Sequence, residues 1–309
     1  MDDTALKLSF ASAMAEVDPE EWNAVANPAG VRFDPFLKWE FLDAMETSGA
    51  ATPNTGWMPR HVLIRDATGR LKAAMPLYGK THSRGEFVFD QSWADAYERA
   101  GGAYYPKLLG AVPFTPVTGR RLLVRPGPDE IRLQTALLSG AIQLAEQNEL
   151  SSLHINFASP AEATMLSETG LLLRTDQQFH WQNRDYGSFD DFLADLSSSK
   201  RKNLRKERAK AQEGLDFVHL RGDDITEAHL DAFYIFYMDT GTRKWGSPYL
   251  TRDTFSLLRE RMADDLLFIF AMSDGAPIAG AMNLIGSDTL YGRYWGCTEH
   301  RSMLHFETC

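Results

Sequence analysis

The sequence predicts an α/β protein built from two similar units in tandem, and three observations lead to this prediction. The chain has 309 residues, which exceeds the usual size of one hydrophobic core and suggests about two domains. Two β-hairpins with the same ending, Ala-Met-x-Leu, are expected over residues 61–78 and 266–284. A helical stretch that opens with Pro, an aromatic residue and Leu precedes each hairpin, at residues 35–45 and 248–258. A shared order of elements indicates a repeated α/β unit.

Each hairpin is predicted from two apolar runs that flank a turn. The turns contain Asp66, Thr68 and Gly69 in the first hairpin and Ser273-Asp-Gly275 in the second, which are residue types that favour turns. Both copies are then expected to continue with one more strand. The remaining predicted elements are strands at 86–90, 153–157, 179–183 and 289–295 and helices at 130–150, 160–168, 198–213 and 230–238.

These elements place the first domain at residues 1–178 and the second at residues 179–309. The first copy has a full set of strands and helices. The second stops directly after its equivalent of the predicted 86–90 strand. We therefore expect a second domain that is incomplete at its C-terminus.

Composition indicates an ordinary globular protein, with 44% hydrophobic and 24% charged residues. The acidic N-terminus has no features of a secretory signal, and the longest apolar run, residues 266–272, is too short to span a bilayer. A cytoplasmic location without a membrane span is expected. The two cysteines, Cys297 and Cys309, provide neither a disulfide framework nor metal-ligand spacing. We expect no metal and no tightly bound cofactor, and nothing in the sequence specifies an oligomeric state.

A strongly basic segment stands out from this acidic chain. Residues 200–210 hold seven basic residues and one glutamate, a net charge of +6, in a chain of net charge −10, so the other residues carry −16. On a helix, Arg201, Arg205 and Arg208 share one face, and Lys202, Lys206 and Lys210 form a neighbouring one. Two interpretations remain open: a solvated helix, or a site for an anionic partner such as a phosphate, tRNA or a nucleotide-linked sugar. On the second interpretation, the candidate binding residues are Lys200, Arg201, Arg205 and Arg208.

The stretch 240–250 is expected to form a loop, because Gly241, Gly246 and Pro248 interrupt the preceding aromatic helix. Basic residues beside aromatic ones suit recognition of a phosphate or carboxylate on a ring-bearing ligand. The candidate binding residues of this loop are Arg243, Lys244, Trp245 and Tyr249.

Residues 290–297 alternate as a strand, so Gly292, Tyr294 and Gly296 share one face. Two glycines on one face indicate close approach of a ligand or of another backbone. Tyr294 is therefore a candidate catalytic hydrogen-bond donor, with core packing as the alternative. Arg293, on the other face, is a candidate for substrate binding. Glu299 is a weaker candidate for a catalytic base, since an exposed Glu after a strand is usually only solvated.

The stretches 240–250 and 290–297, with the basic segment before them and residues 103–108 and 111–120 in the first half, resemble the FemAB-like proteins of peptidoglycan biosynthesis/recognition. These proteins are duplicated members of the GNAT acyltransferase superfamily. The resemblance implies two tandem GNAT-like domains with mixed sheets flanked by helices. It also implies transfer of an acyl or aminoacyl group, from aminoacyl-tRNA in the better-understood relatives, to an amine on a cell-wall precursor.

The acyl donor stays open between aminoacyl-tRNA and acyl-CoA. The Gly-rich turn that holds the phosphates of coenzyme A in many GNAT enzymes is missing after both hairpins, which disfavours acyl-CoA. An acyl-CoA-dependent N-acetyltransferase remains one alternative. A protein that only binds tRNA, another nucleic acid or an anionic cell-wall precursor through the basic helix remains the other.

Overall fold

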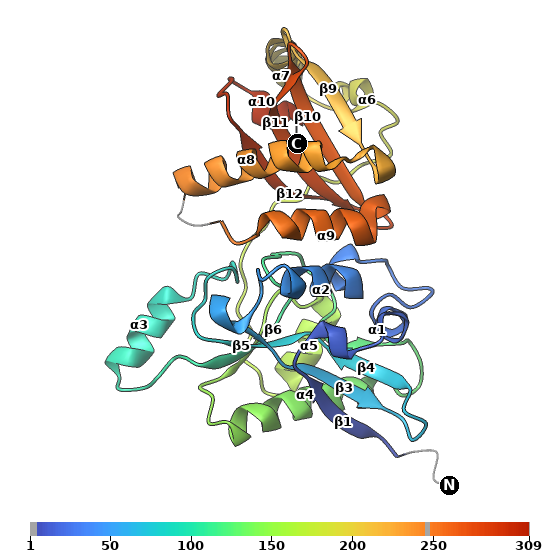
Figure 1. Ribbon diagram of the computed structural model, residues 1–309, viewed down its shortest axis with the longest axis vertical. Helices are drawn as coiled ribbons and strands as arrows, with labels where there is room; N and C mark the ends of the chain where they lie inside the picture. Colours follow the sequence, from blue (N-terminus) through green and yellow to red (C-terminus); the bar gives the residue numbers. More distant parts are fainter. Residues whose placement is uncertain (1–4, 245–247, 309) are drawn as a thin grey trace. The chain divides into compact units, whose positions relative to one another are not determined.

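The computed structural model describes residues 5–244 and 248–308, which divide into two compact units (Figure 1). The first unit contains the chain up to Gly170, together with Tyr249–Asp265 and Ile285–Leu290. The second contains Leu171–Pro248, Leu266–Leu284 and Tyr291–Cys309. The division therefore follows tertiary contacts, and one helix from the second half of the sequence belongs to the first unit.

The first unit contains two four-stranded sheets, with strand orders β1-β3-β4-β7 and β2-β5-β6-β8. Pro76 separates β4 from β5, because proline lacks the N–H that a continuous ladder requires. All the pairs in these sheets are antiparallel except β6 with β8, which are parallel. The strands are β1 (Lys7–Ala11), β2 (Trp57–Pro59), β3 (His61–Arg65), β4 (Leu71–Met75), β5 (Leu77–Lys80), β6 (Lys107–Gly110), β7 (Leu123–Val124) and β8 (Leu153–Ile155).

The helices of the first unit begin at residues suited to capping. The Asp18 side chain accepts from the Glu21 N–H at the start of α1, and Ser159 forms a capping box with Glu162 at α5. The α-helices are α1 (Pro19–Ala26), α2 (Trp39–Thr47), α3 (Gln91–Arg99), α4 (Glu130–Gln147), α5 (Pro160–Glu168) and α9 (Arg252–Met262). Short 3₁₀ helices are η1 (Met14–Glu16), η2 (Pro35–Leu37), η3 (Pro53–Thr55) and η5 (Ala263–Asp265).

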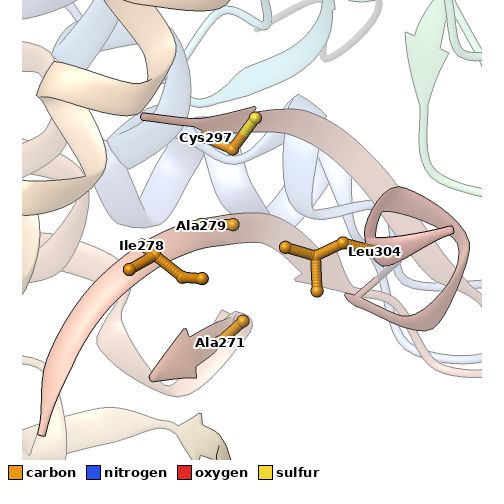
Figure 2. Close-up of a cluster of buried hydrophobic side chains, with 5 residues drawn as sticks. All are labelled: Ala271, Ile278, Ala279, Cys297 and Leu304. Atoms are coloured by element: carbon orange, nitrogen blue, oxygen red, sulfur yellow. The ribbon is translucent and has the colours of Figure 1, made fainter. Parts of the chain in front are cut away.

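The second unit is built on one sheet of order β12-β11-β10-β9. The aromatic helix α8 packs on one face, where the Phe233 ring lies 5.0 Å from the Phe268 ring of β10. The other face holds a small apolar cluster (Figure 2) of Ala271, Ile278, Ala279, Cys297 and Leu304. The elements are α6 (Phe189–Ala194), α7 (Ser198–Gln212), β9 (Asp216–Leu220), η4 (Gly222–Asp224), α8 (Glu227–Lys244), β10 (Leu266–Ser273), β11 (Ala276–Ile285), β12 (Leu290–Cys297) and α10 (Leu304–Thr308).

The same order of elements occurs twice along the chain. Apart from the short 3₁₀ helices and strand β2, which lies between α2 and β3, a strand, two helices and a hairpin follow one another as β1, α1, α2, β3 and β4, and again as β9, α8, α9, β10 and β11. In both copies the first strand pairs antiparallel with the first strand of the hairpin. The two corresponding helices, α2 and α9, pack together in the first unit, where Thr254 Oγ1 donates to Ser48 Oγ at 2.8 Å. The predicted α/β class, both hairpins and the repeated order of helix and hairpin are confirmed, but the strand predicted after the first hairpin is not found.

Two predicted strands are absent. Residues 86–90 form an irregular segment in which Phe87 and Phe89 have φ of 60° and 49°. The physical reason is that Glu86 and Asp90 both bond to the Lys107 ammonium, whereas in a strand the two would be about 13 Å apart. Residues 179–183 have no strand partner and are also irregular, with 90% of Phe179 exposed. None of the helices within residues 5–244 and 248–308 combines the length and the hydrophobicity that a membrane span requires.

Candidate functional site

The arginines of α7 are held by other groups of the second unit. Arg205 Nη2 lies 3.0 Å from Asp190 Oδ1, and Arg208 Nη2 lies 3.2 Å from Glu307 Oε1. Arg201 Nη2 donates to the carbonyl oxygens of residues 194 and 196 at 3.4 and 3.1 Å. Such contacts are individually weak where they are exposed, but together they tie α7 to its own unit. The structure therefore gives these three arginines intramolecular partners.

The lysines of α7 have a different environment. Lys202, Lys206 and Lys210 follow one another at intervals of four residues and share one side of the helix, and their side chains are exposed. We call these three residues the lysine row. Lys200, also exposed, lies near the start of the helix on another side. Within the described part of the chain, none of these four ammonium groups has an ion-pair partner. The lysine row, together with Lys200, is thus the part of the basic segment that is available to an anion.

The predicted loop over 240–250 is partly wrong, because α8 continues through Gly241 to Lys244. Gly241 serves a close contact: a Cβ atom there would lie 2.5 Å from Pro248 Cγ. Arg243 consequently stands on the last turn of the helix, where it forms an ion pair with Asp239 and donates to the Cys297 carbonyl oxygen at 3.3 Å. Trp245 lies outside the described residues.

Tyr249 belongs to the first unit and Arg243 to the second. The two residues that were predicted to form one binding cluster therefore belong to different units. Its ring stacks on the Phe114 ring at a centroid distance of 5.2 Å, and it meets Phe87 edge-on at 6.3 Å. Phe114 and Phe87 have positive φ, a conformation that costs free energy in a bulky residue. Tyr249 is therefore part of an aromatic group in the first unit.

Strand β12 has the predicted alternation, and the structure identifies what approaches its glycine face. A Cβ atom at Gly296 would lie 2.1 Å from the Phe236 carbonyl oxygen of α8, so another backbone occupies that position. Tyr294 lies on the same face and is half-buried, with its ring 5.3 Å from that of Tyr237. The Arg293 guanidinium lies 5.1 Å from the centre of the Tyr294 ring.

A cavity of about 370 Å³ lies at the end of β12, between the last turn of α8 and the segment that leads into α10. The buried atoms Thr240 Oγ1 and Trp295 Nε1, from two of its lining residues, have no hydrogen-bond partner among the described residues. Arg243 and Arg301 also line it, and Arg301 is bonded to Glu299 and Ser273. The lining residues are Thr240, Arg243, Trp295, Cys297, His300, Arg301, Ser302, Met303 and His305.

Two arginines bring positive charge to this cavity, and each is paired with a carboxylate: Arg243 with Asp239 and Arg301 with Glu299. Hydrogen bonding to Cys297 and then to Asp239 raises the pKa of Arg243 above its usual value, so this side chain stays cationic. The predicted base Glu299 is exposed and its carboxylate accepts from Arg301 Nε at 2.7 Å. The described residues contain no group of three His, Cys, Asp or Glu side chains able to hold a metal ion. Cys297 is buried in the apolar cluster (Figure 2) and behaves as a small core residue.

Sequence reasoning missed the cavity residues Thr240, Trp295 and Arg301. It used Thr240 and Trp295 only as members of the quoted stretches, and the signal that could have found them is their position at the adjacent ends of α8 and β12. That the ends of α8 and β12 lie next to each other can be recognised only when the packing of the helix on the sheet is known. Residues at the ends of elements are where binding groups gather.

Sequence reasoning also missed a buried polar cluster in the first unit. Lys107 Nζ donates to Ser83 Oγ at 2.9 Å, Glu86 Oε2 at 3.0 Å and Asp90 Oδ2 at 2.7 Å. Although burial raises the pKa of Asp90, hydrogen bonds from Lys107 and Ser83 hold it at about 2. Burial raises the pKa of Glu86. On the next strand Lys80, opposite Lys107 in register, lies 3.6 Å from the centre of the Trp57 ring.

The family described as FemAB-like, peptidoglycan biosynthesis/recognition, matches residues 13–309. The match spans nearly the whole chain, so this protein belongs to the FemAB-like family, and an acyltransferase-type role follows from that membership. No curated protein matches the chain.

Several solved structures are similar in fold. A tandem GNAT protein from the clavulanic acid biosynthesis pathway is 13% identical, with 97% of this chain and 83% of that chain covered and a TM-score of 0.44. A conserved protein of unknown function from Bacteroides thetaiotaomicron is 10% identical, with 98% of this chain and 86% of that chain covered and a TM-score of 0.49. The N-myristoyltransferase of Saccharomyces cerevisiae is 13% identical, with coverages of 94% and 62% and a TM-score of 0.40. These likenesses assign no activity to the chain.

Proposed function

We propose that this protein transfers an acyl or aminoacyl group to an amine, and that the lysine row of α7 binds a polyanionic donor, for which aminoacyl-tRNA is the leading candidate. The observation that carries the proposal is that the arginines and the lysines of α7 have different surroundings. Its arginines have partners within the second unit, while Lys202, Lys206 and Lys210 are exposed. Electrostatic attraction to phosphates supplies most of the sequence-independent affinity for nucleic acids.

The proposed reaction needs no nucleophilic side chain from the protein. An amine attacks the donor carbonyl, the amine loses a proton to a base or to solvent, and the tetrahedral intermediate collapses with release of the donor's alcohol or thiol. Catalysis then depends mainly on holding the two reactants together and on polarising the carbonyl. Tyr294 remains our candidate for donating a hydrogen bond to the developing oxyanion, and Glu299 a weaker candidate for the base.

Charge reversal of the lysine row tests the proposal. The variant K202E/K206E/K210E should bind uncharged tRNA at least about tenfold more weakly than the parent chain at 50 mM salt, with an unchanged melting temperature. The matched control is K7E/R99E/R174E, which makes the same change in net charge at exposed positions outside α7. Equal affinity of the two variants for tRNA would contradict the proposal.

Tyr294→Phe separates an enzyme from a protein that only binds. In an acyltransferase that uses the hydroxyl, this change should lower turnover by about 10²-fold while the affinity for tRNA is kept. In a binding protein without activity, no turnover is seen in the parent chain, and the variant binds tRNA equally well.

Acyl-CoA is the second candidate donor, and one cavity favours it. A cavity of about 240 Å³ in the first unit lies at the start of the 18-residue helix α4. Three cationic residues, Arg70, Lys72 and Arg125, line it together with two acidic ones, Asp129 and Glu130. Cationic side chains and helix N-termini both suit phosphate groups. Coenzyme A should then raise the melting temperature of the parent chain and not that of R125E. No shift in the parent chain would exclude this candidate.

A further inference from the structure

Residues 171–184 of the second unit form an extended and largely exposed segment. It contains no helix, turn or bend, and none of its residues has a positive φ. Leu172 and Phe179, with 94% and 90% of their surface exposed, are the two most exposed large apolar residues among those that the structure describes, and Trp181 is 66% exposed. In the part of the chain that the structure describes, no backbone hydrogen bond joins residues 179–182 to another segment. Such a segment is a template for pairing with another strand.

Trp181 is held in place by aromatic residues of its own unit. Its ring lies 6.3 Å from that of Tyr186 and 6.1 Å from that of Phe192 in α6. Tyr186 is itself fixed, because its hydroxyl donates to Asp195 Oδ2 at 2.5 Å. The Trp181 ring therefore offers an exposed surface that is already ordered, and rigid aromatic side chains lose little conformational entropy on binding.

The sequence of this segment is complementary to itself in the antiparallel orientation. When two copies pair about a two-fold axis at His180, Phe179 of each copy lies opposite Trp181 of the other. In the same register, Asp176 lies opposite Arg184 of the other copy, so each dimer gains one ion pair on either side of the axis. These three are the only aromatic or opposite-charge combinations that the stretch 176–184 requires, and its other residues are His and amides. Cross-strand aromatic pairs and opposite-charge pairs both stabilise antiparallel sheets.

We propose that two copies of this chain pair through residues 176–184 as antiparallel strands, with Phe179 of each copy packed on Trp181 of the other. A second copy is the occupant because one register satisfies the aromatic side chains and both charges together. The inference goes beyond acyl transfer and does not depend on it.

The size of this interface predicts a weak dimer. Its four aromatic side chains bury roughly 600–1,000 Å² at most, which is below the ~1,200 Å² typical of stable complexes. Each copy also carries a net charge of −10, and the resulting repulsion is screened at physiological salt. We therefore expect reversible association with a Kd of roughly micromolar order.

Sedimentation velocity between about 1 and 500 µM at physiological ionic strength measures the association, and hydrogen exchange of the backbone amides of residues 179–182 locates it. The parent chain should change from monomer to dimer over this range, and exchange of these amides should slow as the dimer forms. A monomer at every concentration would overturn the proposal. Slow exchange that does not depend on concentration would also overturn it, because the segment would then be covered within one chain.

A charge swap tests the register. D176R and R184D each place like charges opposite one another at both ends of the pairing, so each should raise the dimer Kd about tenfold. The double variant D176R/R184D forms the same ion pairs with the charges exchanged and should recover the Kd of the parent chain. R184D also removes the exposed contact between Arg184 and Asp195, and recovery in the double variant separates this local loss from dimerisation. A double variant as weak as the single ones would show the register to be wrong.

F179E tests the aromatic contact. A carboxylate opposite Trp181 should raise the dimer Kd beyond about 500 µM. The matched control is F89E, which makes the same change at a phenylalanine of the first unit that is 70% exposed, and it should leave the dimer Kd unchanged. Equal effects of the two variants would reduce the association to a general charge effect and overturn the proposed interface. The lysine row takes no part in these contacts, so a failure of tRNA binding would leave the association unaffected.

Discussion

Lys80 shows how strongly one buried side chain can deviate from its usual chemistry. It is fully buried, with the Trp57 ring at 3.6 Å and the Arg84 carbonyl oxygen at 3.4 Å from Nζ. Burial lowers its pKa from 10.5 to about 7, with Glu86 acting in the opposite direction and Lys107 in the same one. In the sequence, Lys80 is an ordinary cation at the end of a strand. Only the pairing of β5 with β2 and β6 buries it.

This lowered pKa predicts a definite pH dependence of stability. Between about pH 10.5 and 7, Lys80 is protonated in the unfolded chain but not in the folded protein. The free energy of unfolding therefore falls as pH falls through this window. Below about pH 7 both states are protonated and this dependence ends. Replacing Lys80 with Met should flatten the slope between pH 7 and 10 and stabilise the protein at pH 7 by on the order of a few kcal/mol.

Urea unfolding of the parent chain and K80M at pH 7, 8.5 and 10 provides the measurement. K72M is the control, because Lys72 lies on β4 of the same unit with an exposed side chain, and its pH slope should match that of the parent chain. A slope in K80M equal to that of the parent would show that Lys80 is protonated in the folded state across this range.

At the scale of elements, the packing of α8 on β12 depends on one glycine. Gly296→Ala places a Cβ atom 2.1 Å from the Phe236 carbonyl oxygen, so α8 must move away from the sheet. We expect the free energy of unfolding to fall by about 1–3 kcal/mol, which is typical of overpacking. Gly292→Ala on the same face is the control, since its Cβ atom would meet only Asn283 Oδ1 at 3.5 Å. Thermal unfolding measures both, and equal stability of the two variants would contradict the packing.

The elements also show where sequence patterns succeed and fail. Helix α7, both hairpins and β12 were predictable because periodicity and turn residues are local properties. Residues 86–90 alternate like a strand, but their carboxylates turn to Lys107, a partner that is distant in sequence. Gly241 was interpreted as a helix end, while its role is close contact with Pro248. In each failure a tertiary contact outweighed a local preference.

For the whole molecule, the duplication could be predicted and the candidate site only in part. The repeated order of helix and hairpin gave the architecture, but the first strands of the copies, β1 and β9, became evident only from their pairing with the hairpins. The basic segment was found from its composition. Which of its cations are engaged depends on Asp190 and Glu307, and the two unpartnered donors of the cavity depend on how α8 meets β12.

The distribution of charge over the whole molecule predicts how polyanion binding responds to salt. The net charge of −10 repels a nucleic acid at long range, while the lysine row and Lys200 offer about four phosphate contacts. The logarithm of the tRNA association constant should therefore fall against the logarithm of salt concentration with a slope of about −3 to −4. Reversal of the lysine row leaves only Lys200, so the slope should become about −1, whereas K7E/R99E/R174E should leave it unchanged. Filter binding between 50 and 200 mM salt measures the slope, and a steep slope that survives loss of the lysine row would place the polyanion site elsewhere on the molecule.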